Sequence, residues 1–244
     1  MIVYGQNPVR ELLKARAKAV SVVYLAAGDT GPALRELYEM CRGRGVDVEE
    51  RERPELDALA GREARHQGVV AIAGEHAYVE LEDLLDDIQD QAPPLLVVLD
   101  GVQDPRNLGA IARAAHALGA HGLVIAKDRA APVTAAAVKA SAGATEHLPI
   151  ARVTNLARAL ETLKARGVWT VGAVLRDAPD PAALDLRGPI ALVLGSEGHG
   201  LRPLVERGCD HVVRVPMVGR IASLNVSVAA GILLYEAGRQ RRGA

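Results

Sequence analysis

The chain is poor in aromatic residues and in cysteine. Its 244 residues include no Phe, one Trp and two Cys. Cys41 and Cys209 lie far apart in the sequence, and neither belongs to a Cys-x-x-Cys pair. This spacing argues against a disulfide framework and against a zinc site. We therefore expect no bound metal and a core built mainly from Ala, Val and Leu.

Long apolar runs are also absent. No run of about 18 apolar residues occurs, so we predict no membrane-spanning helix. Arg10 and Glu11 come too early to leave room for the apolar part of a signal peptide. These observations favour a protein of the reducing cytoplasm.

Charge is nearly balanced, with a formal net charge of −1, but it is unevenly distributed. Residues 1–75 carry −1, residues 76–94 carry −6, and residues 95–244 carry +6. We predict an N-terminal unit at 1–75, an acidic linker or short helix at 76–94, and a C-terminal domain at 95–244. A moderately basic domain is compatible with a polyanionic partner.

Both units alternate predicted helices and strands. In the N-terminal unit, helices are expected at 7–17 and 32–44, and strands at 20–25, 46–48 and 69–73. In the C-terminal domain, apolar runs occupy 95–99, 123–125, 169–174, 190–194 and 212–215. The helical segments between them are 107–118, 135–142, 156–166 and 202–207. Continuous apolar runs are typical of strands buried on both faces, so the pattern predicts an α/β fold with a parallel sheet. Ligands of such sheets bind beyond the carboxyl ends of the strands.

The first loop at such an end covers residues 100–109 and leads to Arg113. Asp104 or Asn107 could cap the following helix. Arg113 lies among alanines that would let a ligand approach, although a surface charge or a salt bridge is the alternative. If Asn107 were itself helical, the two side chains would point about 240° apart. They share a site only if Asn107 precedes the helix.

The second loop, residues 195–200, carries glycines at 195, 198 and 200. Glycines permit positive φ and close approach of a ligand to the backbone. The order matches neither the dinucleotide fingerprint nor a P-loop. Glu197 could bind a hydroxyl or act as a base, or it could cap the helix near Arg202. His199 is expected to be a solvated loop residue.

The third segment places Ser223, Asn225 and Ser227 just before an apolar stretch. We expect a helix over residues 223–237. One polar side chain is enough to cap a helix. The other needs a partner, which either the fold or a ligand must supply.

In this order and spacing, the three segments resemble the SpoU/TrmH (SPOUT) family of RNA ribose 2′-O-methyltransferases. They are similar to its Asn-plus-Arg, Gly-x-Glu-Gly and Ser-Leu-Asn motifs. The chain also resembles the bacterial branch that modifies a guanosine in the peptidyl-transferase region of large-subunit (23S) rRNA, at residues 4–5, 66–68, 100–109, 127–129 and 153–158.

The resemblance implies more about the fold than the residues do by themselves. It implies a deep trefoil knot in the C-terminal domain, with the chain near 194–222 threaded through a loop. From the residues alone an ordinary open sheet would be expected, because knots are very rare. It also implies an N-terminal RNA-binding domain similar to a ribosomal protein, and a homodimer with its sites at the subunit interface.

The resemblance further implies S-adenosyl-L-methionine as cofactor, bound by Gly195, Val215, Met217 and Leu224. The implied catalytic residues are Asn107, Arg113, Glu197, Ser223 and Asn225. Because a guanidinium is always charged, Arg113 is better suited to clamp a phosphate or stabilise an alkoxide than to act as a base. Asn107 would orient Arg113 or the ribose, and Glu197 would bind a ribose hydroxyl or take its proton. Ser223 and Asn225 would bridge the knot and the substrate.

Three alternatives remain at this point. The chain could bind RNA without turnover, or it could perform the same chemistry on tRNA. A nucleotide-dependent oxidoreductase also fits the α/β alternation, but the missing dinucleotide fingerprint disfavours it.

Overall fold

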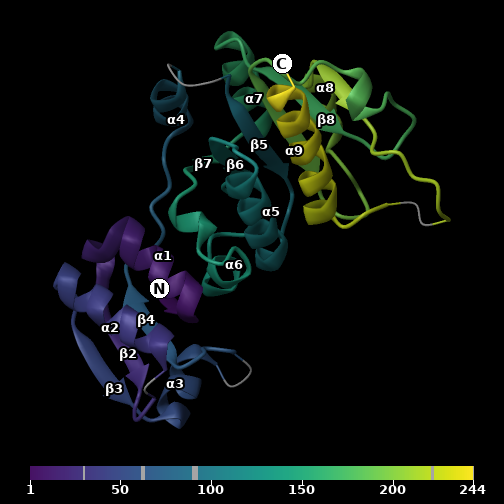
Figure 1. The fold of residues 1–244 in the computed structure, drawn as a ribbon. Helices are drawn as coiled ribbons and strands as arrows, with labels where there is room; N and C mark the ends of the chain where they lie inside the picture. Colours follow the sequence, from purple (N-terminus) through teal and green to yellow (C-terminus); the bar gives the residue numbers. More distant parts are fainter. Residues whose placement is uncertain (30, 62–63, 90–92, 221–222, 244) are drawn as a thin grey trace.

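The computed structural model describes residues 1–29, 31–61, 64–89, 93–220 and 223–243. The chain forms two α/β units joined by an extended segment (Figure 1). Among the described residues, no helix is long and apolar enough to cross a membrane.

The N-terminal unit contains a four-stranded mixed sheet in the order β1-β4-β2-β3. Its strands are β1 (Ile2–Tyr4), β2 (Val20–Ala26), β3 (Val48–Arg51) and β4 (Val69–Ala73). β4 is antiparallel to β1 and β2, whereas β2 and β3 are parallel. The helices of this unit are α1 (Gln6–Arg16), the short η1 (Ala17–Ala19), α2 (Pro32–Arg44) and α3 (Arg53–Ala60).

Three elements of this unit, β1, η1 and α3, were not predicted, and one strand was misplaced. β1 has only three residues, too few for a pattern. α3 begins at a capping box formed by Glu52 and Glu55, a signal that the sequence does contain. The strand expected at 46–48 is instead Val48–Arg51, because β3 is an edge strand with Glu49 and Glu50 exposed.

The C-terminal domain contains a six-stranded sheet in the order β10-β8-β9-β5-β6-β7. All neighbouring strands are parallel, as predicted. The strands are β5 (Leu95–Asp100), β6 (Gly122–Ala126), β7 (Ile150–Val153), β8 (Trp169–Ala173), β9 (Ile190–Gly195) and β10 (His211–Val213). Only β7 was not predicted, because four residues that include Arg152 give a weak apolar signal.

Helices cover both faces of this sheet. Leu95, Val97 and Leu99 of β5 face one layer, and Leu96 and Val98 face the other. The first layer contains α5 (Pro105–Ala117), α6 (Ala135–Ala140), η2 (Ala144–Glu146) and α9 (Val226–Arg242). The second contains α4 (Leu81–Ile88), α7 (Leu156–Ala165) and α8 (Pro203–Gly208). The short η3 (Pro181–Ala183) lies between β8 and β9 in sequence and contacts α9.

Most of the acidic segment is a helix that belongs to the second layer. Leu81, Leu84, Leu85 and Ile88 of α4 are buried against the sheet. Their i, i+3, i+4, i+7 spacing forms one apolar stripe, which leaves the carboxylates facing outward. Of the two predicted forms, linker or short helix, residues 81–88 adopt the helix.

The two units contact each other through α1 and β1 on one side and α6 and η2 on the other. Arg16 Nε donates to Glu146 Oε2 at 2.5 Å, and the Glu146 side chain is fully buried. Glu11 lies 2.7 Å from His147, which adds a second, more exposed pair. A buried ion pair therefore joins the units.

Candidate active site

The loop after β9 is closed on itself by two backbone hydrogen bonds. Ser196 N–H donates to Gly200 O at 3.1 Å, and Gly200 N–H donates to Ser196 O at 3.0 Å. Gly198 and Gly200 adopt positive φ angles of 80° and 67°. A Cβ at Gly195 would lie only 2.0 Å from the carbonyl carbon of Gly200. Glycine at 195 therefore permits the tight return of this loop.

An ion pair between a buried carboxylate and an exposed arginine anchors the end of the same loop. Asp100, the last residue of β5, is 1 % exposed. Its carboxylate accepts hydrogen bonds from Arg202 N–H at 2.7 Å and Arg202 Nε–H at 2.6 Å. Sequence reasoning missed this pair, although a carboxylate at the end of a buried apolar run is a usable signal. Arg202 itself is the N-cap residue of α8, so Glu197 does not cap that helix.

A cavity of about 650 Å³, counting the space open to solvent, lies at the carboxyl ends of β8 and β9. All four predicted cofactor residues line it, namely Gly195, Val215, Met217 and Leu224. Ser223 and Glu197 line it as well. The remaining walls are largely apolar side chains of Ala173, Val174, Leu175, Leu194, Val226 and Ala229.

The segment that borders this cavity offers free backbone groups. Val215, Met217 and Leu224 lie outside helices and strands. Within the described part of the chain, their backbone N–H and C=O groups make no hydrogen bonds. Polar backbone groups that become buried are nearly always hydrogen-bonded, so a ligand in the cavity can pair with these. The cavity thus combines apolar walls with available donors and acceptors.

At the mouth of the cavity, three polar side chains from distant segments form one hydrogen-bonded network. Asn107 Nδ2 donates to Glu197 Oε1 at 3.1 Å, and Asn225 Nδ2 donates to Asn107 Oδ1 at 3.1 Å. Asn225 Nδ2 also donates to Glu197 Oε1. Asn225 Oδ1 accepts from the N–H of Ser227 at 2.9 Å, so Asn225 caps α9 and joins the network at once.

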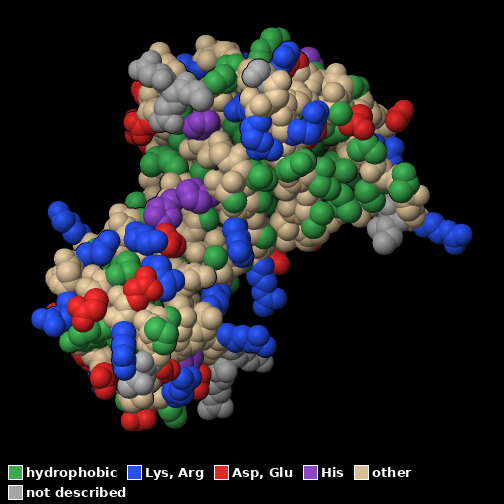
Figure 2. All heavy atoms as spheres, viewed as in Figure 1, with side chains coloured by type: hydrophobic (Ala, Val, Ile, Leu, Met, Phe, Trp, Pro, Cys, Tyr) green, Lys and Arg blue, Asp and Glu red, His purple; other side chains and the backbone are tan. Residues whose placement is uncertain are grey.

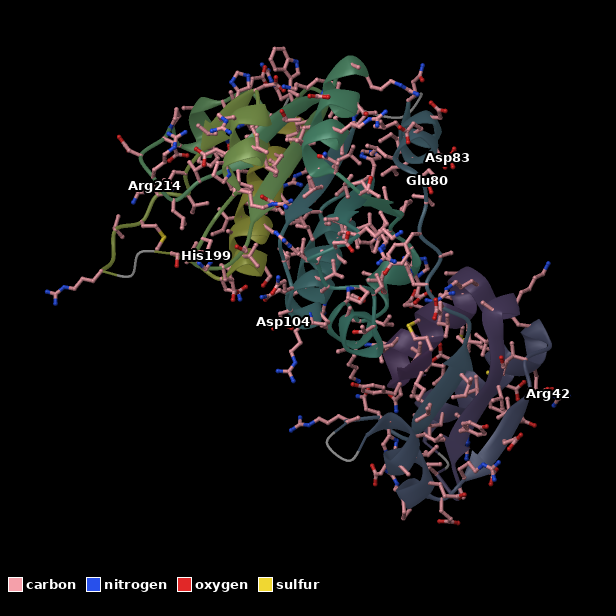
Figure 3. All side chains as sticks on the ribbon, turned by 180° about the vertical axis from the view of Figure 1, so that it is seen from behind. Arg42, Glu80, Asp83, Asp104, His199 and Arg214 are labelled. Atoms are coloured by element: carbon pink, nitrogen blue, oxygen red, sulfur yellow. The ribbon has the colours of Figure 1, made fainter. Side chains whose placement is uncertain are left out.

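A polar cleft adjoins the cavity and shares Ser196, Glu197 and Val226 with it. Asn107 and Arg129 line this cleft. So do Asp104 and His199, which lie on neighbouring loops at one edge of the domain (Figure 3). Glu197 therefore stands between an apolar cavity and a polar cleft, with access to both.

The structure does not bring Arg113 into this network. Asp104 is the N-cap of α5, and Asn107 lies within the first turn of that helix. Asn107 and Arg113 would share a site only if Asn107 preceded the helix, so they do not share one here. Arg113 is exposed, and within the described ranges its guanidinium has no hydrogen bond or ion pair. It remains free to meet a group from outside this chain.

The thiols offer no nucleophile. Burial raises the pKa of Cys41 to about 11 and the pKa of Cys209 to about 12, so neither forms a thiolate near neutral pH. Among the described residues, no group of three His, Cys, Asp or Glu side chains could hold a metal ion. The polar side chains gathered at the site are two amides, a carboxylate and nearby cations.

Family models match almost the whole chain. Residues 94–235 match the SpoU rRNA methylase family, and residues 2–79 match the RNA 2′-O ribose methyltransferase substrate-binding domain. The chain belongs to the SpoU methylase family, and it carries that family's substrate-binding domain at its N-terminus.

Individual relatives are similar to this chain over nearly their full length. The 23S rRNA (guanosine-2′-O-)-methyltransferase RlmB of Xanthomonas campestris pv. campestris is 45 % identical over 245 residues, covering 99 % of this chain and 97 % of the relative. RlmB of Pseudomonas syringae pv. tomato is 44 % identical over 242 residues, covering 98 % and 95 %. The crystal structure of the SpoU methyltransferase AviRb from Streptomyces viridochromogenes, in complex with AdoMet, superposes with a TM-score of 0.82 at 30 % identity and covers 100 % of this chain and 91 % of that one.

Proposed function

We propose that this protein transfers a methyl group from S-adenosyl-L-methionine to the ribose 2′-hydroxyl of a guanosine in 23S rRNA. The observation that carries the proposal is Glu197, which lines both the apolar cavity and the polar cleft while two amides hold it. A cofactor on one side and a ribose on the other would meet at this carboxylate. The relatives named RlmB support the choice of a 23S rRNA guanosine.

The lining of the cavity fits the cofactor in its chemistry. Val174, Leu175 and Leu194 offer apolar contact for an adenine ring. Gly195 and Leu224 border the site with backbone groups. When bound, the cofactor supplies an electrophilic methyl group on a sulfonium sulfur.

In this proposal, Glu197 takes the proton of the 2′-hydroxyl. Both amide hydrogen bonds reach Oε1, and within the described structure Oε2 has no hydrogen-bonding partner. A ribose hydroxyl donating to Oε2 would pass its proton to the carboxylate, and its oxygen would take the methyl group as that group's bond to sulfur breaks and leaves its electron pair on the sulfur. Asn107 and Asn225 hold the carboxylate in one orientation meanwhile. Ser223, at the cavity wall, would contact the ribose or the cofactor.

The pH dependence of the rate tests this role. A general base must be deprotonated, so the native rate constant kcat should fall on the acid side of its profile. Glu197→Gln removes the base but keeps the shape of the side chain, and we expect a lower kcat with no acid limb. A variant that retained the native acid limb would show that Glu197 only positions the substrate.

In this proposal, Arg113 acts at a site that forms only when two copies of the chain make a dimer. Arg113 is exposed on α5, away from the network of its own chain. Beside α5, the helix α9 exposes Val228, Ile232 and Tyr235, which are 49 %, 39 % and 56 % accessible. Hydrophobic side chains gather over this helix (Figure 2). A second copy covering α9 would bring Arg113 to a site between the subunits, where it would stabilise a phosphate or the developing alkoxide.

Arg113→Ala separates this role from cofactor binding. Methyl transfer should be lost, whereas the Kd for S-adenosyl-L-methionine should stay within about twofold, because Arg113 does not line the cavity. Loss of cofactor binding in this variant would contradict the role assigned to Arg113.

A deep trefoil knot is part of the proposed fold, with the chain near 194–222 passing through a loop. The path of the chain supports it. α9 follows the edge strand β10, yet it packs against α5 and against β9 within the sheet. The connection from β10 to α9 thus begins at the edge of the sheet and ends beside its middle strands. An experimentally traced backbone over residues 194–225 would test the threading.

The N-terminal unit would bind the rRNA substrate, in keeping with the substrate-binding model that it matches. Ribosome assembly takes place in the bacterial cytoplasm, and we place the enzyme there. The decisive experiment maps 2′-O-methylation on 23S rRNA from a strain that lacks the gene. Loss of a single guanosine mark, restored by the native protein with labelled cofactor, is the expected result. A full set of rRNA marks, or a loss confined to tRNA, would overturn the assignment.

A further inference from the structure

A second groove opens beside the polar cleft, at the carboxyl ends of β6 and β7. It encloses about 800 Å³, counting the space open to solvent. Three cationic residues line it, Lys127, Arg152 and Arg158. The other residues that line it are Glu80, Leu81, Glu82, Val153, Thr154, Asn155, Ala159 and Thr162. Nothing in the proposed methyl transfer uses these cations.

The cations of this groove are available to a ligand. Lys127 and Arg158 are exposed, and their charged groups make no hydrogen bond or ion pair within the described residues. Arg152 is held in place instead. Its guanidinium donates to Lys127 O at 3.2 Å and stacks over the Tyr78 ring at 5.1 Å. The groove thus combines one fixed cation with two free ones.

The two carboxylates of the groove do not neutralise it. Glu80 is the N-cap residue of α4, and Glu82 lies in the first turn of that helix. In the described structure, neither comes within 4.0 Å of a cationic nitrogen of the groove. Three cations against two carboxylates leave a small positive excess that a polyanion could use. Removing one of these carboxylates should strengthen the binding of a polyanion, which allows a second test.

Residues 127–129 connect the groove with the active site. Lys127 lines the groove, whereas Asp128 and Arg129 line the polar cleft that contains Asn107 and Glu197. β5, β6 and β7 are consecutive neighbours in the sheet. Strand neighbours are about 4.8 Å apart, so the end of β7 lies only about 10 Å from the end of β5. An RNA strand with its reacting ribose at Glu197 would pass the groove with its adjoining nucleotides.

We propose that this groove binds the phosphodiester backbone of the RNA next to the methylated nucleotide, through Lys127, Arg152 and Arg158. The proposal rests on the proposed function, because it takes the cleft at Glu197 as the place of the reacting ribose. Backbone phosphates carry no sequence information, so the groove sets the position and register of the strand. Choice of the nucleotide is left to other contacts.

Binding of in-vitro-transcribed 23S rRNA, measured across a salt series, tests the groove. In Lys127→Ala/Arg158→Ala two phosphate contacts are lost. The slope of log affinity against log salt should then be shallower by about 1.4, at about 0.7 for each contact of a single strand. The ratio of native to variant affinity should consequently shrink about sevenfold between 50 and 200 mM salt. Arg207→Ala is the matched control, because Arg207 is exposed and lies outside the groove.

A second pair of variants excludes misfolding as the explanation. Glu82→Gln removes a carboxylate from the groove and should tighten RNA binding about twofold at low salt, the effect expected for unit charges about 8 Å apart in water. Asp83→Asn is its control, since Asp83 shares the first turn of α4 but does not line the groove. A misfolded protein would not gain affinity.

The outcomes for the groove and for the proposed function differ. If the native protein methylates no RNA, the proposed function fails whatever the groove does. If the native protein methylates 23S rRNA but the double variant keeps the native salt slope, the groove proposal is overturned. Equal gains in Glu82→Gln and Asp83→Asn would overturn it too. Support requires a shallower slope, a raised KM for RNA and an unchanged Kd for S-adenosyl-L-methionine.

Discussion

Gly195→Ala offers the most direct test of the cofactor loop. A Cβ at this position would lie 2.0 Å from the carbonyl carbon of Gly200, 2.2 Å from its oxygen and 2.3 Å from the nitrogen of Leu201. Ordinary contacts begin near 3.4 Å, so the backbone of Gly200 would have to retreat by about 1.4 Å. All three neighbours are backbone atoms, so no side-chain rotation can relieve the contact.

This movement of the Gly200 backbone would break the hydrogen bonds that close the loop. The two hydrogen bonds between Ser196 and Gly200, now 3.1 and 3.0 Å, would lengthen beyond the range of a hydrogen bond. Each contributes about 1 kcal/mol, so opening the loop costs about 2 kcal/mol. If cofactor binding requires the closed loop, a penalty of about 2 kcal/mol raises the Kd roughly 30-fold.

Isothermal titration of S-adenosyl-L-methionine measures this change. Gly188→Ala is the matched control, because its Cβ would meet nothing within 4 Å and Gly188 has no positive φ. We expect the control to bind the cofactor with the native Kd. Native affinity in Gly195→Ala would refute the reasoning, because it would mean that the loop can accommodate a side chain without opening.

Three further predictions concern the junction between the units and the surface of α9. Burial is the main cause that lowers the pKa of His76 in the folded protein. As the pH falls below about 6.5, the unfolded chain therefore binds a proton at His76 before the folded chain does, and the folded state loses stability. His76→Leu should lessen the fall in Tm between pH 7.5 and 5.5, and an equal fall in the native protein and the variant would contradict this. Glu146→Gln leaves Arg16 without its buried partner and should cost about 3 kcal/mol, or about 6–12 °C in Tm, in a thermal melt; an unchanged Tm would show that the pair contributes nothing. Tyr235→Lys, which places a charge on the exposed face of α9, should shift the protein to monomers in sedimentation velocity and reduce turnover, whereas a native sedimentation profile would argue against α9 as the dimer face.

The sequence predicted the local elements well where the pattern was long and apolar. Five of the six strands of the C-terminal sheet were identified from their apolar runs, and β7 was missed because four residues carry little pattern. The same limit applies to β1. The acidic segment is different, since its stripe of leucines was visible but its burial against the sheet depends on the final packing.

In the candidate site, too, some features were predicted from the sequence and others were found only in the structure. The strand-end loops pointed to Asn107, Glu197 and Asn225, and the structure joins these three residues across separations of 90 and 118 positions. The sequence left open whether Asn107 precedes its helix or belongs to it, and the structure places it inside α5, which separates it from Arg113. Sequence reasoning also did not find the ion pair between the buried Asp100 and the exposed Arg202, 102 positions apart.

The sequence by itself determined the α/β alternation, the apolar strands and the polar residues placed at their ends, because periodicity and turn chemistry act over a few neighbouring residues. Only the tertiary structure decided which strand ends are neighbours, which amides hold Glu197 and which cations line the second groove. The physical reason is that a contact between distant segments depends on the path of the whole chain. That path is set by the burial of both sheet faces together, and no local pattern specifies it.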